Sequence, residues 1–139
     1  MTIAEWTVFG AVLLYLLTVA PAKAFGYRTF DNANPRDPAF YKSGIRARAL
    51  GAHLNGIETF PFFAAAVLLA EFRGQPQHWI DVLAVAFLAI RFAYVLAYLG
   101  NRPTLRTLLW NLGLFANAAI FLMPWWWPIY GNRIADLLA

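Results

Sequence analysis

Four long apolar stretches, separated by short polar segments, make up most of the chain. They cover residues 3–24, 47–70, 79–99 and 105–129. A transmembrane helix needs about 20 mostly apolar residues, so each stretch is long enough to cross a bilayer. The longest connecting segment, residues 25–46, is too short for a soluble domain. The pattern therefore predicts one all-α domain over residues 1–139, an integral membrane bundle of four helices.

Composition supports the same class. Of the 139 residues, 61% are hydrophobic and 13% are charged, whereas soluble domains are nearer half apolar and a quarter charged. The first stretch carries Glu5 and lacks a basic start or a cleavage signal, so we expect it to be retained as a helix. The chain has no cysteine and only two distant histidines, His53 and His78, so we expect neither disulfides nor a metal site.

Basic residues are distributed unevenly between the connecting segments. Only Arg73 and Arg133 belong to the second connection and the C-terminal end. Eight others lie in or beside the first and third connections: Lys23, Arg28, Arg36, Lys42, Arg46, Arg48, Arg102 and Arg106. The positive-inside rule then predicts cytoplasmic first and third connections and two periplasmic termini, as in a bacterial inner membrane. The net charge of +4 reflects this topology and gives no indication of nucleic-acid binding.

Two charged residues fall inside the apolar stretches at similar depths. Glu58 and Arg91 each lie roughly 14 Å from the predicted cytoplasmic face, at 1.5 Å per helical residue. A charge at that depth costs a few kcal/mol unless it is paired or functional. The matching depths predict that Glu58 and Arg91 form an ion pair.

Other polar residues share helix faces with these two. Helical spacing places Arg48, Asn55 and Glu58 on one face of the second helix, and Arg91, Tyr94 and Tyr98 on one face of the third. Two facing polar stripes predict a pocket that opens to the cytoplasm, with arginines of the third connection at its mouth. The alternative is that these residues only join helix to helix. His53 points away from the stripe and is predicted to make a helix contact.

Three segments together resemble a known family. The first contains Ala-His-Leu-Asn-Gly-Ile-Glu followed by Phe-Pro, over residues 52–61, and the second contains Arg91, Tyr94 and Leu-Gly over residues 91–100. The third is the pair Arg106-Thr107. This combination resembles the MAPEG superfamily (membrane-associated proteins in eicosanoid and glutathione metabolism), including microsomal glutathione transferases and prostaglandin E synthase. The loop at residues 31–36 resembles that of bacterial members.

The resemblance implies a homotrimer that binds glutathione as cosubstrate between subunits, near the cytoplasmic face. The implied electrophile is a lipophilic small molecule that arrives from the membrane lipids. Arg106, Thr107 and Tyr98 would stabilise the thiolate and so act in catalysis, and Arg91 would brace Glu58. The implied glutathione-binding residues are Asn55, Glu58, Arg48, Arg91, Tyr94 and Tyr98.

The chain departs from the eicosanoid enzymes at two positions. Gly51 and Leu54 stand where those enzymes carry arginine on the glutathione face. Three hypotheses therefore stay open: a glutathione-dependent transferase, peroxidase or isomerase; a catalytically silent member that binds a lipid headgroup or another anionic molecule in the same pocket; and a structural or regulatory protein whose polar residues only join its helices.

Overall fold

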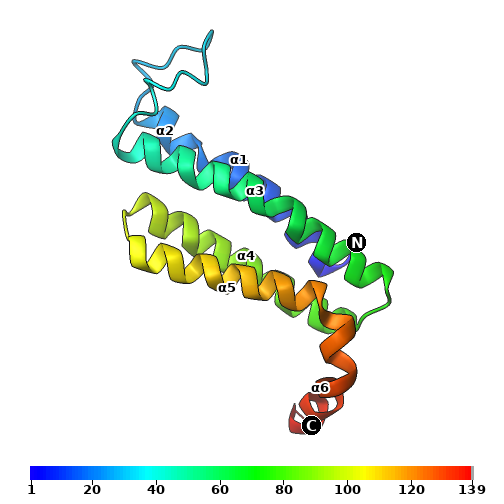
Figure 1. Ribbon diagram of the computed structural model, residues 1–139. Helices are drawn as coiled ribbons and strands as arrows, with labels where there is room; N and C mark the ends of the chain where they lie inside the picture. The colour runs from blue at the N-terminus through cyan, green and yellow to red at the C-terminus, as the bar shows by residue number, and fades with distance from the viewer. Residues whose placement is uncertain (139) are drawn as a thin grey trace.

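The fold is all-helical over residues 1–138, which a computed structural model describes, with side chains described to residue 130. Helices are the regular elements of this part of the chain (Figure 1). In order they are α1 (Ile3–Thr18), α2 (Ala20–Ala24), α3 (Gly44–Phe72), α4 (Gln77–Leu99), α5 (Pro103–Phe121) and α6 (Met123–Leu138).

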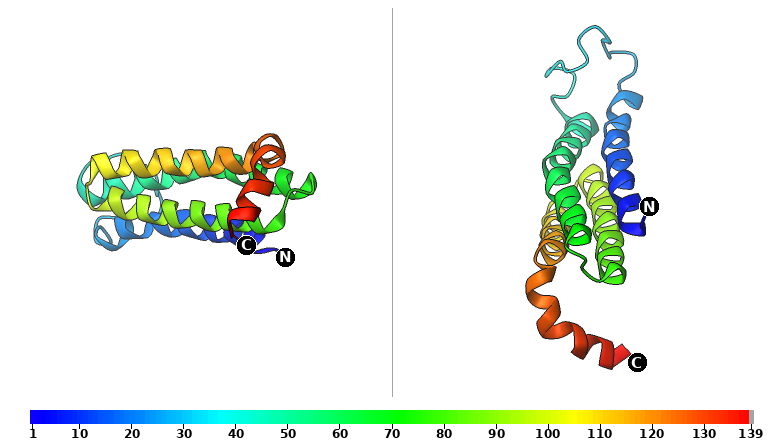
Figure 2. Two further views of the ribbon diagram at one scale, coloured as in Figure 1. Left: turned by 90° about the horizontal axis from the view of Figure 1, so that it is seen from below. Right: turned by 90° about the vertical axis from the view of Figure 1, so that its right-hand side faces the viewer.

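The long helices pack side by side as an elongated bundle (Figures 1 and 2). α4 and α5 form the most extensive helix pair, α1 packs on α3 and α4, and α3 also contacts α5. The loop between α2 and α3 and the turn between α4 and α5 lie at one end of the bundle. The N-terminus and the α3–α4 connection lie at the other end.

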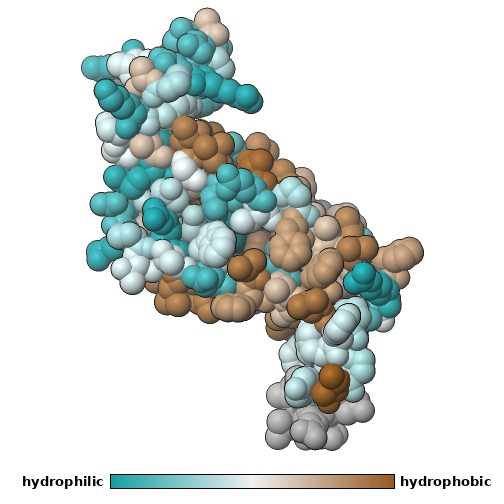
Figure 3. Space-filling view, in the orientation of Figure 1, coloured by the Kyte–Doolittle hydropathy of each residue, from teal (hydrophilic) through white to brown (hydrophobic). Residues whose placement is uncertain are grey.

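Three segments are long and apolar enough to cross a membrane: Ile3–Ala24, Gly44–Phe72 and Gln77–Leu99. A fourth is present if α5 and residues 123–130 form one span that is bent by 78°. Large apolar side chains such as Leu17, Phe92 and Phe115 are exposed on the outside of the bundle. Hydrophilic residues gather at the end that carries the long loop (Figure 3). The expected fold class, an integral membrane four-helix bundle, is confirmed.

Two helix breaks subdivide the first and fourth apolar stretches. Val19 separates α1 from α2, and Pro21 follows in the first turn of α2, where its missing N–H is tolerated. The helix also breaks at Leu122, and Trp126 Nε1 donates to Ala119 O across this break at 2.8 Å. Pro61, by contrast, lies inside α3, which is assigned as one helix from Gly44 to Phe72.

Small residues let the helices approach closely in the core. Ala4, Ala11, Ala66 and Ala84 are fully buried, as expected where membrane helices pack through van der Waals contact. In the same core, the rings of Phe63 on α3 and Phe87 on α4 stack with their centroids 4.0 Å apart. The resulting packing holds α3 and α4 in a fixed register, which positions the polar residues described next.

Candidate functional site

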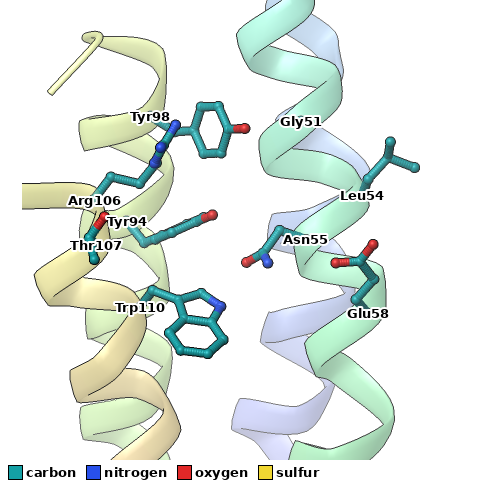
Figure 4. Close-up of a pocket in the computed structure, with 9 residues that line it drawn as sticks. All are labelled: Gly51, Leu54, Asn55, Glu58, Tyr94, Tyr98, Arg106, Thr107 and Trp110. Atoms are coloured by element: carbon teal, nitrogen blue, oxygen red, sulfur yellow. The ribbon is translucent and has the colours of Figure 1, made fainter. Parts of the chain in front are cut away.

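A cavity of about 360 Å³ lies between α3 on one side and α4 with α5 on the other. Its volume falls within the range of small-molecule sites. The close-up shows its side chains facing one another across the gap between these helices (Figure 4). Nine residues line it: Gly51, Leu54, Asn55, Glu58, Tyr94, Tyr98, Arg106, Thr107 and Trp110.

Helical periodicity explains why these residues meet. On α3 the lining positions are spaced by three, four and seven residues from the first, which is one face of a helix. On α4 Tyr94 and Tyr98 are four residues apart, and on α5 Arg106 and Trp110 are again four apart. Six sequence-predicted site residues thus share one cavity: Asn55, Glu58, Tyr94, Tyr98, Arg106 and Thr107.

Arg106 is oriented by an aromatic ring. Its guanidinium carbon lies 4.6 Å from the ring centroid of Tyr98 (Figure 4), a cation–π geometry. Tyr98 packs edge-to-face on Tyr94, with centroids 5.7 Å apart. The Thr107 hydroxyl donates to Pro103 O at 3.1 Å. The guanidinium of Arg106 and the hydroxyl of Tyr98 therefore lie together at the cavity, where both can donate to a ligand.

Gly51 makes room for Tyr98. A Cβ placed on Gly51 would lie 2.5 Å from the Tyr98 hydroxyl and 2.9 Å from its Cζ. No side chain at position 51 fits while Tyr98 keeps this place. The absence of a side chain at position 51 therefore lets the Tyr98 hydroxyl of α4 approach α3 at the cavity.

Arg91 is paired with Asn55, and the predicted ion pair with Glu58 is wrong. Arg91 is only 1% exposed, its Nη2 donates to Asn55 Oδ1 at 2.8 Å, and its guanidinium lies 4.2 Å from the Tyr94 ring centroid. No salt bridge joins Glu58 to Arg91 in the part of the chain with described side chains. Glu58 is exposed at the cavity, whereas Asn55, one turn earlier, faces α4. Counting residues along each helix predicted similar depths for the two charges. It gave no information on the direction in which each side chain points around its helix.

Arg48 does not line the cavity. Its Nε donates to Leu99 O, the last carbonyl of α4, at 2.9 Å. A carbonyl at a helix C-terminus has no partner within its helix, and a cation there also interacts favourably with the helix dipole. In this structure Arg48 therefore stabilises the end of α4. Its predicted contact with glutathione stays a prediction without support from the geometry.

His53 lies outside the cavity, as predicted. Its Nδ1 is 2.7 Å from Tyr15 O on α1. The neighbouring Gly56 accommodates the Tyr15 ring, which occupies the space where a Cβ would stand. The contact joins α1 to α3, so the prediction of a helix-contact role is confirmed.

The sequence analysis did not predict that residues of α5 beyond its first turn contribute to the site. Trp110 lines the cavity, and Asn117 is buried seven residues later. Positions 106, 110, 113 and 117 follow helical spacing, so the same periodicity used for the second and third helices would have found them. Among the described residues, no group of three His, Asp or Glu side chains is placed to hold a metal ion.

Apolar spans around a cavity that carries hydroxyl, amide, carboxylate and guanidinium groups define a small integral membrane protein with a polar site inside its helix bundle. The sequence matches the MAPEG family over residues 3–126, so the chain belongs to that family. The resemblance inferred from the sequence is thereby confirmed. A comparison with curated proteins finds no match.

Proposed function

We propose that this protein is a membrane-bound glutathione-dependent transferase or peroxidase that acts on lipophilic electrophiles. One observation carries the proposal: Arg106, Thr107 and Tyr98 gather in the same cavity as Asn55 and Glu58. These are the residues that the family resemblance assigns to thiolate stabilisation and to glutathione binding. The cavity brings both sets together from three different helices.

The main chemical step is stabilisation of a thiolate. A nearby guanidinium favours the charged form of a thiol, and the thiolate is the nucleophile. The Tyr98 ring holds the Arg106 guanidinium in place, 4.6 Å from the ring centroid. The thiolate then attacks the electrophile, an S–C bond forms, and the leaving group departs with the electrons of its broken bond. With a hydroperoxide, the thiolate attacks the terminal oxygen, the O–O bond breaks, a sulfenic acid forms, and the alkoxide takes up a proton and leaves as an alcohol. The thiol of a second glutathione then attacks the sulfenic sulfur, an S–S bond forms, and water leaves.

The free carboxylate of Glu58 fits the ammonium group of glutathione. Because Arg91 is bonded to Asn55, Glu58 lacks a cationic partner among the described residues and is exposed at the cavity. An ammonium group of a ligand would supply the missing charge. A carboxylate without a cationic partner favours a zwitterionic ligand more strongly than a carboxylate paired with Arg91 would have done.

The proposal includes a homotrimer in which a second copy closes the open side of the cavity. Leu54 and Glu58, which line the cavity, are exposed on one side of α3 together with the neighbouring Ile57. The mass of the detergent-purified protein by native mass spectrometry tests this, with 15.6 kDa per chain. A monomer that binds glutathione would contradict the shared site.

Equilibrium binding of glutathione to detergent-purified protein tests the function. We expect saturable binding with thiolate absorbance near neutral pH, and Arg106→Ala should remove the thiolate signal while the protein stays folded. Arg102→Ala is the matched control, because this exposed arginine does not line the cavity. No binding, or a thiolate signal that persists in Arg106→Ala, would overturn the proposal.

A second candidate is a catalytically silent protein that binds an anionic small molecule or a lipid headgroup. The low cation content of the cavity favours this candidate over the enzyme, because Arg106 is the single cation among the nine lining residues and glutathione carries two carboxylates. Each lost charged hydrogen bond could cost about 1.5–3 kcal/mol of glutathione affinity. Binding of glutathione without turnover of 1-chloro-2,4-dinitrobenzene or of a lipid hydroperoxide would support this candidate over the enzyme.

A further inference from the structure

A second cavity, which we call the annex, lies between α3, α4 and α5 next to the main cavity. Its volume is about 130 Å³, and it shares Glu58 and Trp110 with the main cavity. The remaining lining residues are Thr59, Phe62, Phe87, Arg91, Gly113, Leu114 and Asn117. Apolar and aromatic side chains thus form most of its wall, and a few polar groups interrupt it.

Two buried polar side chains of the annex keep atoms without a partner. Arg91 and Asn117 are 1% and 2% exposed. The Nη2 atom of Arg91 is bonded to Asn55, but its Nε has no hydrogen-bond partner in the described part of the chain, and neither has Asn117 Oδ1. Buried polar groups are ordinarily hydrogen-bonded, because an unsatisfied one keeps its full desolvation cost. Both side chains line the annex, so a small rotation of either one would present an unsatisfied donor or acceptor to a molecule that enters it.

The chemistry of these groups restricts the ligand. A hydroxyl group both donates and accepts, which matches a guanidinium N–H together with an amide. Rotation about the last side-chain bond of Asn117 can turn either its oxygen or its nitrogen toward the annex. An anionic ligand would face the carboxylate of Glu58, and a cationic ligand would face Arg91. A neutral hydroxyl group is compatible with both.

The size and walls restrict it further. A cavity of roughly 150 Å³ is large enough for a benzene molecule, and the annex has a similar volume with Phe62, Phe87 and Trp110 in its wall. We propose that the annex binds a neutral hydroxyl compound built on a single aromatic ring. This proposal goes beyond the proposed function and does not require that glutathione binds.

Ligand-observed ¹⁹F NMR on the detergent-purified full chain, without glutathione, tests the proposal with two matched probes. 4-Fluorophenol carries the hydroxyl group and fluorobenzene lacks it, and empty micelles measure partition into detergent. We expect saturable binding of 4-fluorophenol with about tenfold preference over fluorobenzene, the size expected when a site keeps polar groups that the analogue leaves unpaired. Equal affinities, or no saturable binding of 4-fluorophenol, would overturn the proposal. The second outcome would mean that the annex holds water only.

Three variants assign the binding to the annex. Asn117→Leu should abolish the preference, whereas Asn111→Leu should keep it, because Asn111 does not line the annex and bonds Thr107 O on its own helix. Gly113→Ala is a second test of the annex, which can be used if Asn117→Leu does not fold. Its new Cβ would lie 3.6 Å from Arg91 Cδ, an ordinary contact, so the protein should fold with a narrower annex and bind 4-fluorophenol several times more weakly.

The annex proposal and the glutathione proposal fail separately. Arg106→Ala changes the main cavity but not the annex, so this variant should still prefer 4-fluorophenol. A preference that survives in Asn117→Leu, or an unchanged affinity for 4-fluorophenol in Gly113→Ala, would place the probe elsewhere and overturn the annex proposal. Loss of glutathione binding alone would leave it intact.

Discussion

At the scale of single residues, the choice of partner for Arg91 organises the site. A guanidinium buried to 1% exposure needs acceptors, and in this structure the acceptor is the neutral amide of Asn55. The rings of Tyr94 and Tyr15 lie on the same guanidinium, at 4.2 and 5.7 Å from centroid to carbon. Arg91 is thus stabilised without a second buried charge, whose desolvation would offset much of the attraction. Glu58 is consequently available at the open side of the cavity.

Replacing Asn55 should therefore destabilise the protein more than replacing Glu58. Asn55→Ala removes the acceptor of a buried charge, and we expect a loss of about 1.5–3 kcal/mol. Glu58→Gln alters an exposed side chain without a salt bridge in the described structure, so the expected change is within about 0.5 kcal/mol. Thermal unfolding in detergent without ligand measures both. A larger loss in Glu58→Gln would mean that the two charges pair after all.

Gly51→Ala should disturb the cavity through Tyr98. The added methyl group would lie 2.5 Å from the Tyr98 hydroxyl, so the ring must move. We expect about 1–3 kcal/mol of destabilisation from this overpacking, and weaker glutathione binding. In the double variant with Tyr98→Phe, which removes the closest atom, the cost should be smaller than the sum of the single changes. Additive unfolding free energies would show that the two residues do not compete for space.

At the scale of helices, the sequence predicted the spans but not their interruptions. Apolar length is enough to find the four stretches, because the bilayer sets a minimum length for each. Hydropathy does not register the breaks at Val19 and Leu122, since apolar residues continue through both. Periodicity placed Asn55, Tyr94 and Tyr98 on the correct faces. It failed for the contact between Glu58 and Arg91, because rotation of α3 relative to α4 depends on close packing such as the ring stack in the core.

The end of α4 should depend on Arg48. Its Nε bonds the Leu99 carbonyl, and α4 then turns sharply into α5 through Asn101, which has a positive φ of 55°. Arg48→Met keeps the apolar stem but removes the donor, so we expect a loss of about 0.5–1.5 kcal/mol and faster amide exchange in residues 99–102. Hydrogen exchange by mass spectrometry checks this, with Arg46→Met as the control. Arg46 lies over the Phe40 ring in the loop and does not reach α4's last carbonyl.

At the scale of the whole molecule, the two ends of the helix bundle differ in their content of basic residues. The structure places the loop between α2 and α3 at the same end as the α4–α5 turn (Figure 1). Eight of the eleven lysine and arginine residues lie in or beside those two connections. The candidate site opens nearer to this end, because Gly51 and Tyr98 lie in the adjoining turns of α3 and α4. A water-soluble cosubstrate would then enter from the side on which the basic loops lie.

The absence of cysteine makes this orientation directly measurable. Single cysteines at Ala33 and His78 probe opposite ends, and both positions are exposed. If the basic end is cytoplasmic, a membrane-impermeant maleimide should label His78→Cys in spheroplasts but label Ala33→Cys only after permeabilisation. The unmodified chain supplies the unlabelled background. The reverse pattern would place the cavity mouth outside the cell, where a cytoplasmic thiol cosubstrate could not reach Arg106, and so orientation and proposed function are tested together.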